Sequence, residues 1–177
     1  MKIYTGKGDN GKTSIMSGEE VSKDSIVIET IGNIDELNAM IGLNISICKH
    51  DEIKSILYLV QSNLFSISSE IASYKVHQNN NIIKISHGDI KRIENQINTI
   101  NSKLPELKGF IFFDGSFLAS NFNLSRTTCR RTERVVVRFL AKNKMKTYIL
   151  VYLNRLSDLL FVLARYADLL GDGNEAI

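Results

Sequence analysis

Turn-forming residues are scarce in this chain of 177 residues, which contains one proline, 11 glycines and no tryptophan. A chain so poor in turn formers favours long helices over a sheet of many short strands. Cysteine is also scarce, because Cys48 and Cys129 are the only two, and both lie in apolar patterns of helical period. We therefore expect buried thiols in a reducing cytosol and no disulfide.

Long apolar segments and a strong net charge are missing as well. No uninterrupted apolar run approaches the roughly 20 residues that a membrane-spanning helix needs, and residues 1–5 show no apolar signal region. We expect a cytoplasmic protein. The net charge is only +3, which does not suit a nucleic-acid-binding protein. The three histidines lie between expected helices at no metal-ligand spacing, and no Ser/His/Asp set or G-x-G-x-x-G motif is evident.

Hydrophobic residues at helical period fill most of the chain. They predict five antiparallel helices, over about residues 33–49, 51–73, 88–104, 116–140 and 147–170. Asn33 is the expected N-cap of the first helix, with Asp35 in its first turn. Residues 1–32 are expected to form a non-helical arm, in which the β-branched residues 25–31 are extended or a turn. No repeat or domain boundary is evident, so we expect one domain over 1–177, with the bundle over 33–171.

Five arginines lie within the expected fourth helix. One stripe of this helix has apolar residues at its ends and small residues in its middle. It consists of Leu118, Phe122, Ser125, Cys129, Thr132, Val136 and Leu140. Arg126, Arg130 and Glu133 fall on the adjacent stripe, at spacings of four and three residues. Guanidinium groups beside a buried face are costly unless an anion meets them. Two explanations remain open: ion pairs within the protein, or a polyphosphate ligand held by bidentate contacts.

A glycine-rich segment precedes the helices. Residues 6–13 match the P-loop pattern G-x-x-x-x-G-K-[ST], in which backbone N–H groups, a lysine and a threonine bind phosphates and Mg²⁺. A P-loop fold also requires a buried strand before the motif and a helix directly after it, and neither is predicted here. The segment therefore predicts a phosphate-binding loop without the P-loop fold. The alternative is a flexible arm with no ligand.

Two further polar features allow either a functional or a structural interpretation. Asn154 and Asp158 lie one turn apart on the fifth helix, where they could recognise a ligand or satisfy neighbouring helices. Asp35 could act in a site, or only favour the dipole of the first helix.

Several blocks of sequence, taken in order, resemble one family. The first comprises Ile3-Tyr4-Thr5, Gly8-Asp9, Gly11, Thr13-Ser14, Val21-Ser22-Lys23-Asp24 and Gly32-Asn33-Ile34-Asp35-Glu36-Leu37-Asn38. The second comprises Gln61, Leu64-Phe65 and Glu70-Ile71-Ala72. The third comprises Phe110-Ile111, Gly115-Ser116, Arg126-Thr127, Cys129-Arg130-Arg131, Glu133-Arg134, Tyr152 to Phe161 and Ala164-Arg165-Tyr166. In this order the chain resembles the PduO-type ATP:corrinoid adenosyltransferases, from residue 3 to about residue 167.

The resemblance implies an all-α fold, a ferritin-like up-and-down bundle of five helices with an N-terminal ATP-binding arm. It also implies a homotrimer with active sites between subunits, and transfer of the 5′-deoxyadenosyl group of ATP to cob(I)alamin with release of triphosphate and with Mg²⁺. Position by position, it assigns ATP binding to Thr5, Gly6, Lys7, Gly8, Thr13, Ser14, Lys23, Arg130, Arg131, Thr132, Glu133, Arg134 and Asn154. Asp35 and Arg126 match a pair that bridges subunits, and Phe110 matches an aromatic residue on the corrin side.

This chemistry agrees with the residues present. Co(I) is itself the nucleophile, so the protein must supply alignment and stabilisation of the leaving triphosphate. We expect catalytic roles for Arg126, Arg130, Asp35 and Phe110, while Glu133 could hold Mg²⁺ or orient Arg130. Phe110 could instead only fill the end of the bundle. The partners expected are ATP, a corrinoid and a cob(II)alamin reductase. Two alternatives are an ATP hydrolase that uses residues 6–13 as a P-loop, and a non-catalytic helical carrier of corrinoid or nucleotide.

Overall fold

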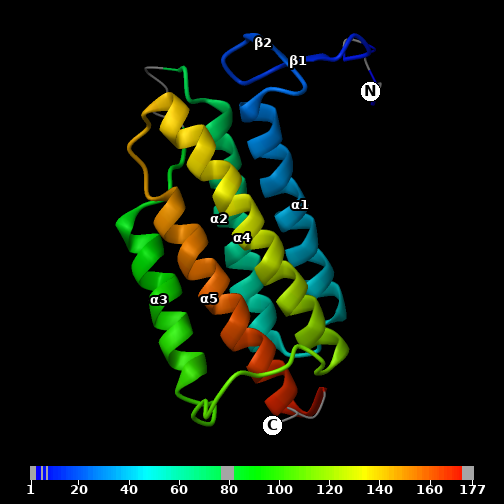
Figure 1. The fold of residues 1–177 in the computed structure, drawn as a ribbon, viewed down its shortest axis with the longest axis vertical. Coiled ribbons are helices and arrows are strands. Elements are labelled where there is room, and N and C mark those ends of the chain that lie inside the picture. Colours follow the sequence, from blue (N-terminus) through cyan, green and yellow to red (C-terminus); the bar gives the residue numbers. More distant parts are fainter. Residues whose placement is uncertain (1–2, 5, 7, 77–81, 173–177) are drawn as a thin grey trace.

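The computed structural model describes residues 3–4, 6, 8–76 and 82–172 as a bundle of five helices with a small N-terminal hairpin (Figure 1). The helices are α1 (Ile26–Ile47), α2 (Asp51–Ala72), α3 (His87–Asn101), α4 (Phe117–Asn143) and α5 (Ile149–Ala167), followed by the π-helical turn η1 (Asp168–Asp172). The hairpin consists of strands β1 (Lys12–Ser14) and β2 (Glu20–Ser22), which pair antiparallel. The predicted all-α bundle is confirmed.

Successive helices alternate in direction along the bundle (Figure 1). α4 lies between α1 and α5, and α1 also packs on α2, while α3 packs on α5. α3 and α5 are therefore neighbours that run in the same direction. The buried stripe predicted for α4 faces the core, as do both cysteines, which form no disulfide. No helix among the described residues is both long and apolar enough to cross a membrane.

The first helix begins earlier than the sequence indicated. α1 starts at Ile26, so the predictions of an N-cap at Asn33 and of extended or turn structure over 25–31 are wrong. Val27 and Thr30 are buried at helical spacing from Ile34, and Thr30 Oγ1 donates to the carbonyl oxygen of Ile26 at 2.6 Å. Packing of these residues into the core overrides the strand preference of β-branched side chains. The non-helical arm is thus shorter than 1–32.

The ends of the other helices show how local chemistry sets their lengths. α2 has the predicted bounds to within one residue. α3 begins with a capping box, in which the Ser86 hydroxyl accepts from Asp89 N while the Asp89 carboxylate accepts from Ser86 N. α3 ends at Asn101, three residues before the predicted end, because the residue before Pro105 is disfavoured in helical conformation.

The hairpin lies beyond the end of the bundle where α1 begins (Figure 1). Within the arm, which was predicted only as non-helical, β2 pairs Val21 with Thr13 of β1. The hairpin is attached to the bundle by Ile15, which is buried in the core, by Val21, which packs against it, and by Glu19, which forms an ion pair of 2.7 Å with Lys75 after α2. No parallel sheet accompanies the glycine-rich segment in the described part of the chain, so rejection of a P-loop fold is supported.

Candidate functional site

One flank of α4 faces α1 and uses its arginines in ion pairs. Arg131 Nη2 lies 2.6 Å from Glu36 Oε1, and Arg138 Nη2 lies 2.7 Å from Glu29 Oε1. The hydrogen bond with Glu36 raises the pKa of Arg131. Thr132 is buried between the same two helices, where its hydroxyl donates to the carbonyl oxygen of Asn33 at 3.1 Å. On this flank the explanation by ion pairs within the protein holds.

The opposite flank of α4 carries Arg126, Arg130 and Glu133, and none of them forms an ion pair with the described residues. Arg126 is half-buried, donates from Nε to Asn123 Oδ1 at 3.3 Å and lies over the Phe113 ring at 4.8 Å. Burial, and then the positive charge of Arg130, lower the pKa of Arg126. Two guanidinium groups thus lie close together, and neither forms an ion pair with a described carboxylate, which is a favourable arrangement for an anionic ligand.

The remaining ATP-binding candidates of α4 and α5 lie around this flank. Arg134 is exposed and donates from Nη1 to the carbonyl oxygen of Arg130 at 3.0 Å. The buried thiol of Cys129 donates to the carbonyl oxygen of Leu153 at 3.3 Å, directly before Asn154. Burial raises the pKa of this thiol, and the charges of Glu133, Arg130 and Asp158 also act on it. These residues of α4 and α5 therefore share one neighbourhood, in which no hydrogen bond joins Glu133 to Arg130.

Asp35 lies far from Arg126 within the chain. Contacts of Thr132 with Asn33, and of Ser125 with Asn44, fix the antiparallel register of α4 against α1. This register places Asp35 about six residues, or roughly 9 Å, from the level of Arg126 along the bundle. Asp35 also lies on the flank of α1 that faces α2, where Gln61 contacts the neighbouring turn of α1. One chain alone does not bring this pair together.

The described residues of the glycine-rich loop form tight turns in front of the hairpin. Asp9 N donates to the carbonyl oxygen of Gly6 at 3.3 Å. The side chain of Lys23 lies over the loop and close to Gly8: a Cβ atom added at Gly8 would lie 3.0 Å from Lys23 Nζ. Thr13 and Ser14 belong to β1. Lys12 is held by an ion pair of 2.9 Å with Glu20. The candidates Thr5 and Lys7 lie outside the described residues.

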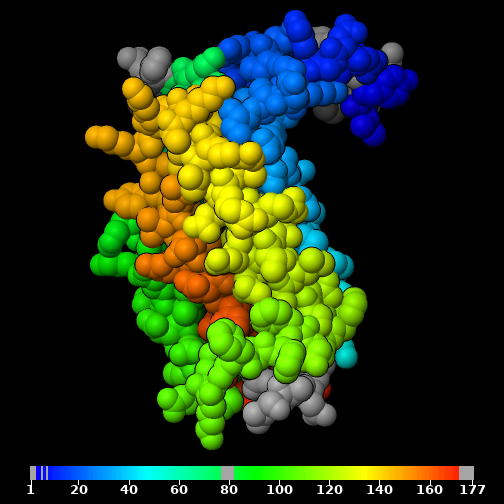
Figure 2. Space-filling view, viewed as in Figure 1, coloured from blue at the N-terminus to red at the C-terminus, as the bar shows by residue number. Residues whose placement is uncertain are grey.

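The loop and the arginines of α4 do not meet within one chain. The hairpin overhangs the end of the bundle in the space-filling view (Figure 2). Arg130 lies 13 residues before the end of α4 that is nearest to the hairpin, a distance of about 20 Å along the helix. The predicted ATP site is therefore divided into two parts in the single chain.

Phe110 is fully exposed, in the segment between α3 and α4. The alternative that it fills the end of the bundle is therefore wrong. Phe112, Phe113 and Phe117 are also exposed. This segment is held at both ends by α5 and η1, because Arg165 donates to the carbonyl oxygen of Pro105 at 2.7 Å and Asp168 Oδ1 accepts from Ser116 N at 2.7 Å.

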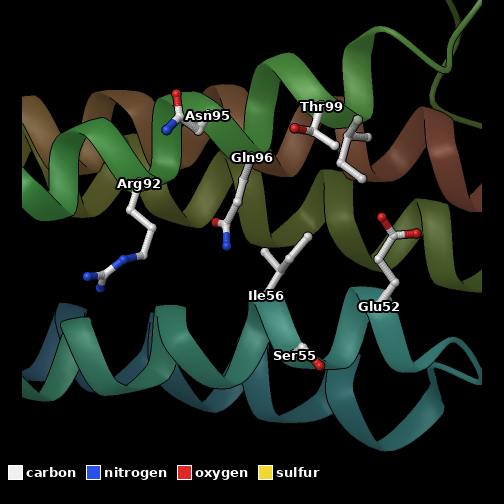
Figure 3. Close-up of a pocket in the computed structure, with 8 residues that line it drawn as sticks. Glu52, Ser55, Ile56, Arg92, Asn95, Gln96 and Thr99 are labelled. Atoms are coloured by element: carbon white, nitrogen blue, oxygen red, sulfur yellow. The ribbon is translucent and has the colours of Figure 1, made fainter.

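A groove elsewhere in the bundle contains none of these candidates. A cavity of about 390 Å³ separates α2 from α3 (Figure 3). It is lined by Glu52, Ser55, Ile56, Arg92, Asn95, Gln96, Thr99 and Ile100. None of these residues is a predicted site residue, and Figure 3 shows Arg92 and Gln96 pointing from α3 toward α2, with Ile56 and Glu52 pointing back toward α3.

The fold and the flank of α4 without ion pairs together define a helical-bundle protein with a local cationic surface. Residues 3–167 match the family model for cobalamin adenosyltransferase. The chain is 36% identical over 168 residues to the corrinoid adenosyltransferase PduO of Citrobacter freundii, covering 95% of this chain and 50% of that protein. It is 35% identical over 172 residues to the corrinoid adenosyltransferase of Bacillus subtilis, covering 95% and 87%.

Solved structures give the same assignment. A variant of the PduO-type ATP:corrinoid adenosyltransferase from Lactobacillus reuteri, complexed with cobalamin and ATP, is similar with a TM-score of 0.92 and 28% identity. The alignment covers 99% of this chain and 96% of that one. The chain belongs to the cobalamin adenosyltransferase family. It spans half the length of the Citrobacter relative, and most of the Bacillus relative.

Sequence reasoning missed three residues that surround the candidate site. Phe113 stacks on Arg126, Asp168 caps the start of α4, and Glu94 binds Arg155, the residue next to Asn154. No sequence motif marks Asp168 or Glu94, since each contacts a residue that is far away in the sequence. Phe113 could have been suspected from its place in the aromatic run 110–113.

Proposed function

We propose that this chain transfers the 5′-deoxyadenosyl group of ATP to the cobalt of a cob(I)alamin. The electron pair of Co(I) attacks C5′ of the ribose, so a Co–C bond forms while the C5′–O bond breaks. The leaving oxygen keeps the bonding electrons, and triphosphate departs intact. No side chain need act as nucleophile, and the chain supplies alignment and charge.

The observation that carries this proposal is the pair of neighbouring guanidinium groups, Arg126 and Arg130, with no carboxylate bound among the described residues. The other arginines of α4 that form ion pairs do so on the α1 flank. A triphosphate gains negative charge as it leaves, so cations fixed on a rigid helix stabilise the transition state more than the substrate. Asn154, in the same neighbourhood, offers an amide to the nucleotide.

Mg²⁺ fits this arrangement as an ion held mainly by the phosphates. The described residues contain no group of three or more potential metal ligands. Glu133 is half-buried, lies one turn from Arg130 and forms no ion pair with any described residue. Mg²⁺ in nucleotide sites uses one or two carboxylates together with phosphate oxygens and water. Glu133 would supply such a carboxylate, and the ion would neutralise charge on the triphosphate.

A homotrimer with sites between subunits would explain the divided site. The loop of one copy would meet the arginines of another, and Asp35 of one copy would bridge to Arg126 of the next. Within one chain, the loop lies about 20 Å from Arg130 along the helix direction. This separation supports a site completed by a second copy.

The substrates imply two further features. Cob(I)alamin is strongly reducing, so a cob(II)alamin reductase in the cytoplasm would supply it. The exposed Phe110 is available to cover the lower face of the corrin, where it would exclude water and the axial base. Burial of so exposed an aromatic ring against a ligand would also contribute binding energy.

The test is incubation with ATP, Mg²⁺ and chemically reduced cobalamin, followed by detection of adenosylcobalamin and intact triphosphate. Arg130→Ala should lower kcat/KM by about 2–4 kcal/mol of transition-state stabilisation. Arg138→Ala is the matched control, because Arg138 lies on the same helix but is bound to Glu29, and its loss should have little effect.

Other outcomes would favour the alternatives. Phosphate release without a corrinoid, abolished by Lys12→Ala, would support the hydrolase. Binding of ATP or corrinoid without turnover would support the carrier. Equal losses in Arg130→Ala and Arg138→Ala would contradict the assigned role of the unpaired flank.

A further inference from the structure

The amide of Asn154 is held by a chain of two side chains from α5 and α3. Arg155 donates from Nη1 to Asn154 Oδ1 at 2.9 Å and from Nε to Glu94 Oε1 at 2.9 Å. A guanidinium group carries only donors, so the amide atom that faces Arg155 must be the oxygen. This contact therefore fixes which end of the amide points toward Arg155.

The other end of the amide has no hydrogen-bond partner in the described part of the chain. Asn154 is partly exposed, and its Nδ2 donates to no described residue. Asn154 lies on the α4 side of α5, next to the neighbourhood of Arg130, whereas Arg155 turns toward α3. The NH2 group of Asn154 therefore faces the open side of the site as a hydrogen-bond donor, while its carbonyl oxygen already accepts from Arg155.

Glu94 contacts the same guanidinium group from the neighbouring helix. Arg155 follows Asn154 directly, so the two side chains leave α5 about 100° apart, and a long unanchored arginine would sample many rotamers. The ion pair with Glu94 holds the guanidinium between the two helices. α3 and α5 run in the same direction and pack against each other, so Glu94 approaches Arg155 from a helix and not from a loop.

We propose that Glu94 and Arg155 are positioning residues that present Asn154 Nδ2 as a donor, so that Asn154 reads a hydrogen-bond acceptor of the nucleotide. This inference rests on the proposed binding of ATP at this face. The acceptors of an adenosine are the ring nitrogens N1, N3 and N7 and the ribose oxygens, whereas the exocyclic amino group is a donor. The amino group is therefore excluded as the partner of Asn154.

The test compares ATP with analogues that each lack one acceptor: 1-deaza-, 3-deaza- and 7-deaza-ATP, and the 2′-deoxy and 3′-deoxy nucleotides. A sixth ligand, purine riboside triphosphate, lacks only the amino group. Binding is measured by calorimetry to the wild-type protein and to Asn154→Ala. One acceptor-deleted analogue should bind the wild type about 3- to 10-fold more weakly than ATP, the usual effect of one hydrogen bond. It should lose this penalty in Asn154→Ala.

The positioning role is tested with the same analogue. Glu94→Ala should reduce the penalty to less than about half, while Glu94→Gln, which keeps an acceptor for Arg155, should restore most of it. Glu52→Ala is the matched control, because it removes a different exposed ion pair, between Glu52 of α2 and Lys103 just after α3, without touching Arg155. It should leave the discrimination between nucleotides unchanged.

Three results would overturn the inference. The first is a penalty that depends on Asn154 for purine riboside triphosphate alone, since the amide would then accept from the amino group. The second is the absence of any penalty that depends on Asn154. The third is full discrimination in Glu94→Ala. Adenosylation of the corrinoid with ATP is measured in parallel. If the wild-type protein shows no adenosylation, the proposed function is refuted, whatever the analogues show.

Discussion

Charge reversal at Asp35 and Arg126 tests whether a second copy completes the site. The two side chains lie on opposite flanks of the α1–α4 pair and about 9 Å apart along the bundle, so they are separated by roughly 15 Å or more within one chain. At that distance two charges in water interact by about 0.3 kcal/mol, and screening at physiological salt leaves well under 0.1 kcal/mol. Any larger coupling must come from another copy.

The assay is a double-mutant cycle on the free energy of assembly. Asp35→Arg, Arg126→Asp and the double variant are compared with the wild type by sedimentation at several protein concentrations. Each single variant should weaken assembly by placing like charges together, and the double variant should recover part of the loss. We expect a coupling energy of about 0.5–3 kcal/mol, as for residues in direct contact.

A matched pair within the chain supplies the control. Glu29 and Arg138 form an ion pair of 2.7 Å, so the swap of Glu29→Arg with Arg138→Glu should show coupling in the free energy of unfolding, of about 0.2–1 kcal/mol. The same swap should show no coupling energy in the free energy of assembly. Additive effects of Asp35 and Arg126 on assembly, or a fully active monomer, would refute the bridging arrangement.

Three further predictions concern the segment between α3 and α4 and the start of α3. Phe110→Ala should change the free energy of unfolding by less than about 0.5 kcal/mol, because the ring is exposed, yet impair adenosylation of cobalamin more than of cobinamide, which lacks the axial base. Equal losses on both corrinoids would remove its role at the corrin. Ser86→Ala should cost about 1 kcal/mol in denaturant unfolding. Burial raises the pKa of Asp89, but the hydrogen bonds from Ser86 outweigh it and leave that pKa below 3.8. This stabilisation is present above about pH 4 and is lost as the pH falls through the lowered pKa, so Ser86→Ala should flatten the acid dependence of stability below about pH 4. A parallel acid profile would contradict this. Gly115→Ala places a methyl group against the carboxylate that caps α4, and should lower the melting temperature clearly, whereas Gly109→Ala, which meets no atom within 4 Å, should not.

Helical period was sufficient to predict the number and order of the helices, because each buries one apolar stripe. It failed at Ser25, where the N-cap has no side-chain hydrogen bond and the β-branched residues that follow resemble a strand. Only the packing of Val27 and Thr30 against the core explains the early start of α1. Local patterns could not contain that information.

The candidate site was predicted in its residue types but not in its arrangement. Arg130 and Arg131 are adjacent in sequence, yet a rotation of about 100° places Arg131 beside Glu36 and leaves Arg130 without an ion pair among the described residues. The sequence does not reveal which helix lies on which side of α4. For the same reason, it could not show that the glycine-rich loop and Arg130 lie apart in one chain.

α5 contacts or carries residues of two regions, the proposed nucleotide site and the exposed aromatic segment, which would bind different molecules. Near its start it carries Asn154, and its C-terminal end, continued by η1, holds both ends of the exposed aromatic segment through Arg165 and Asp168. A displacement of α5 at one region would also move the residues that α5 carries at the other. Thermodynamic reciprocity then applies: the factor by which a nucleotide alters the affinity for a corrinoid equals the factor by which the corrinoid alters the affinity for the nucleotide.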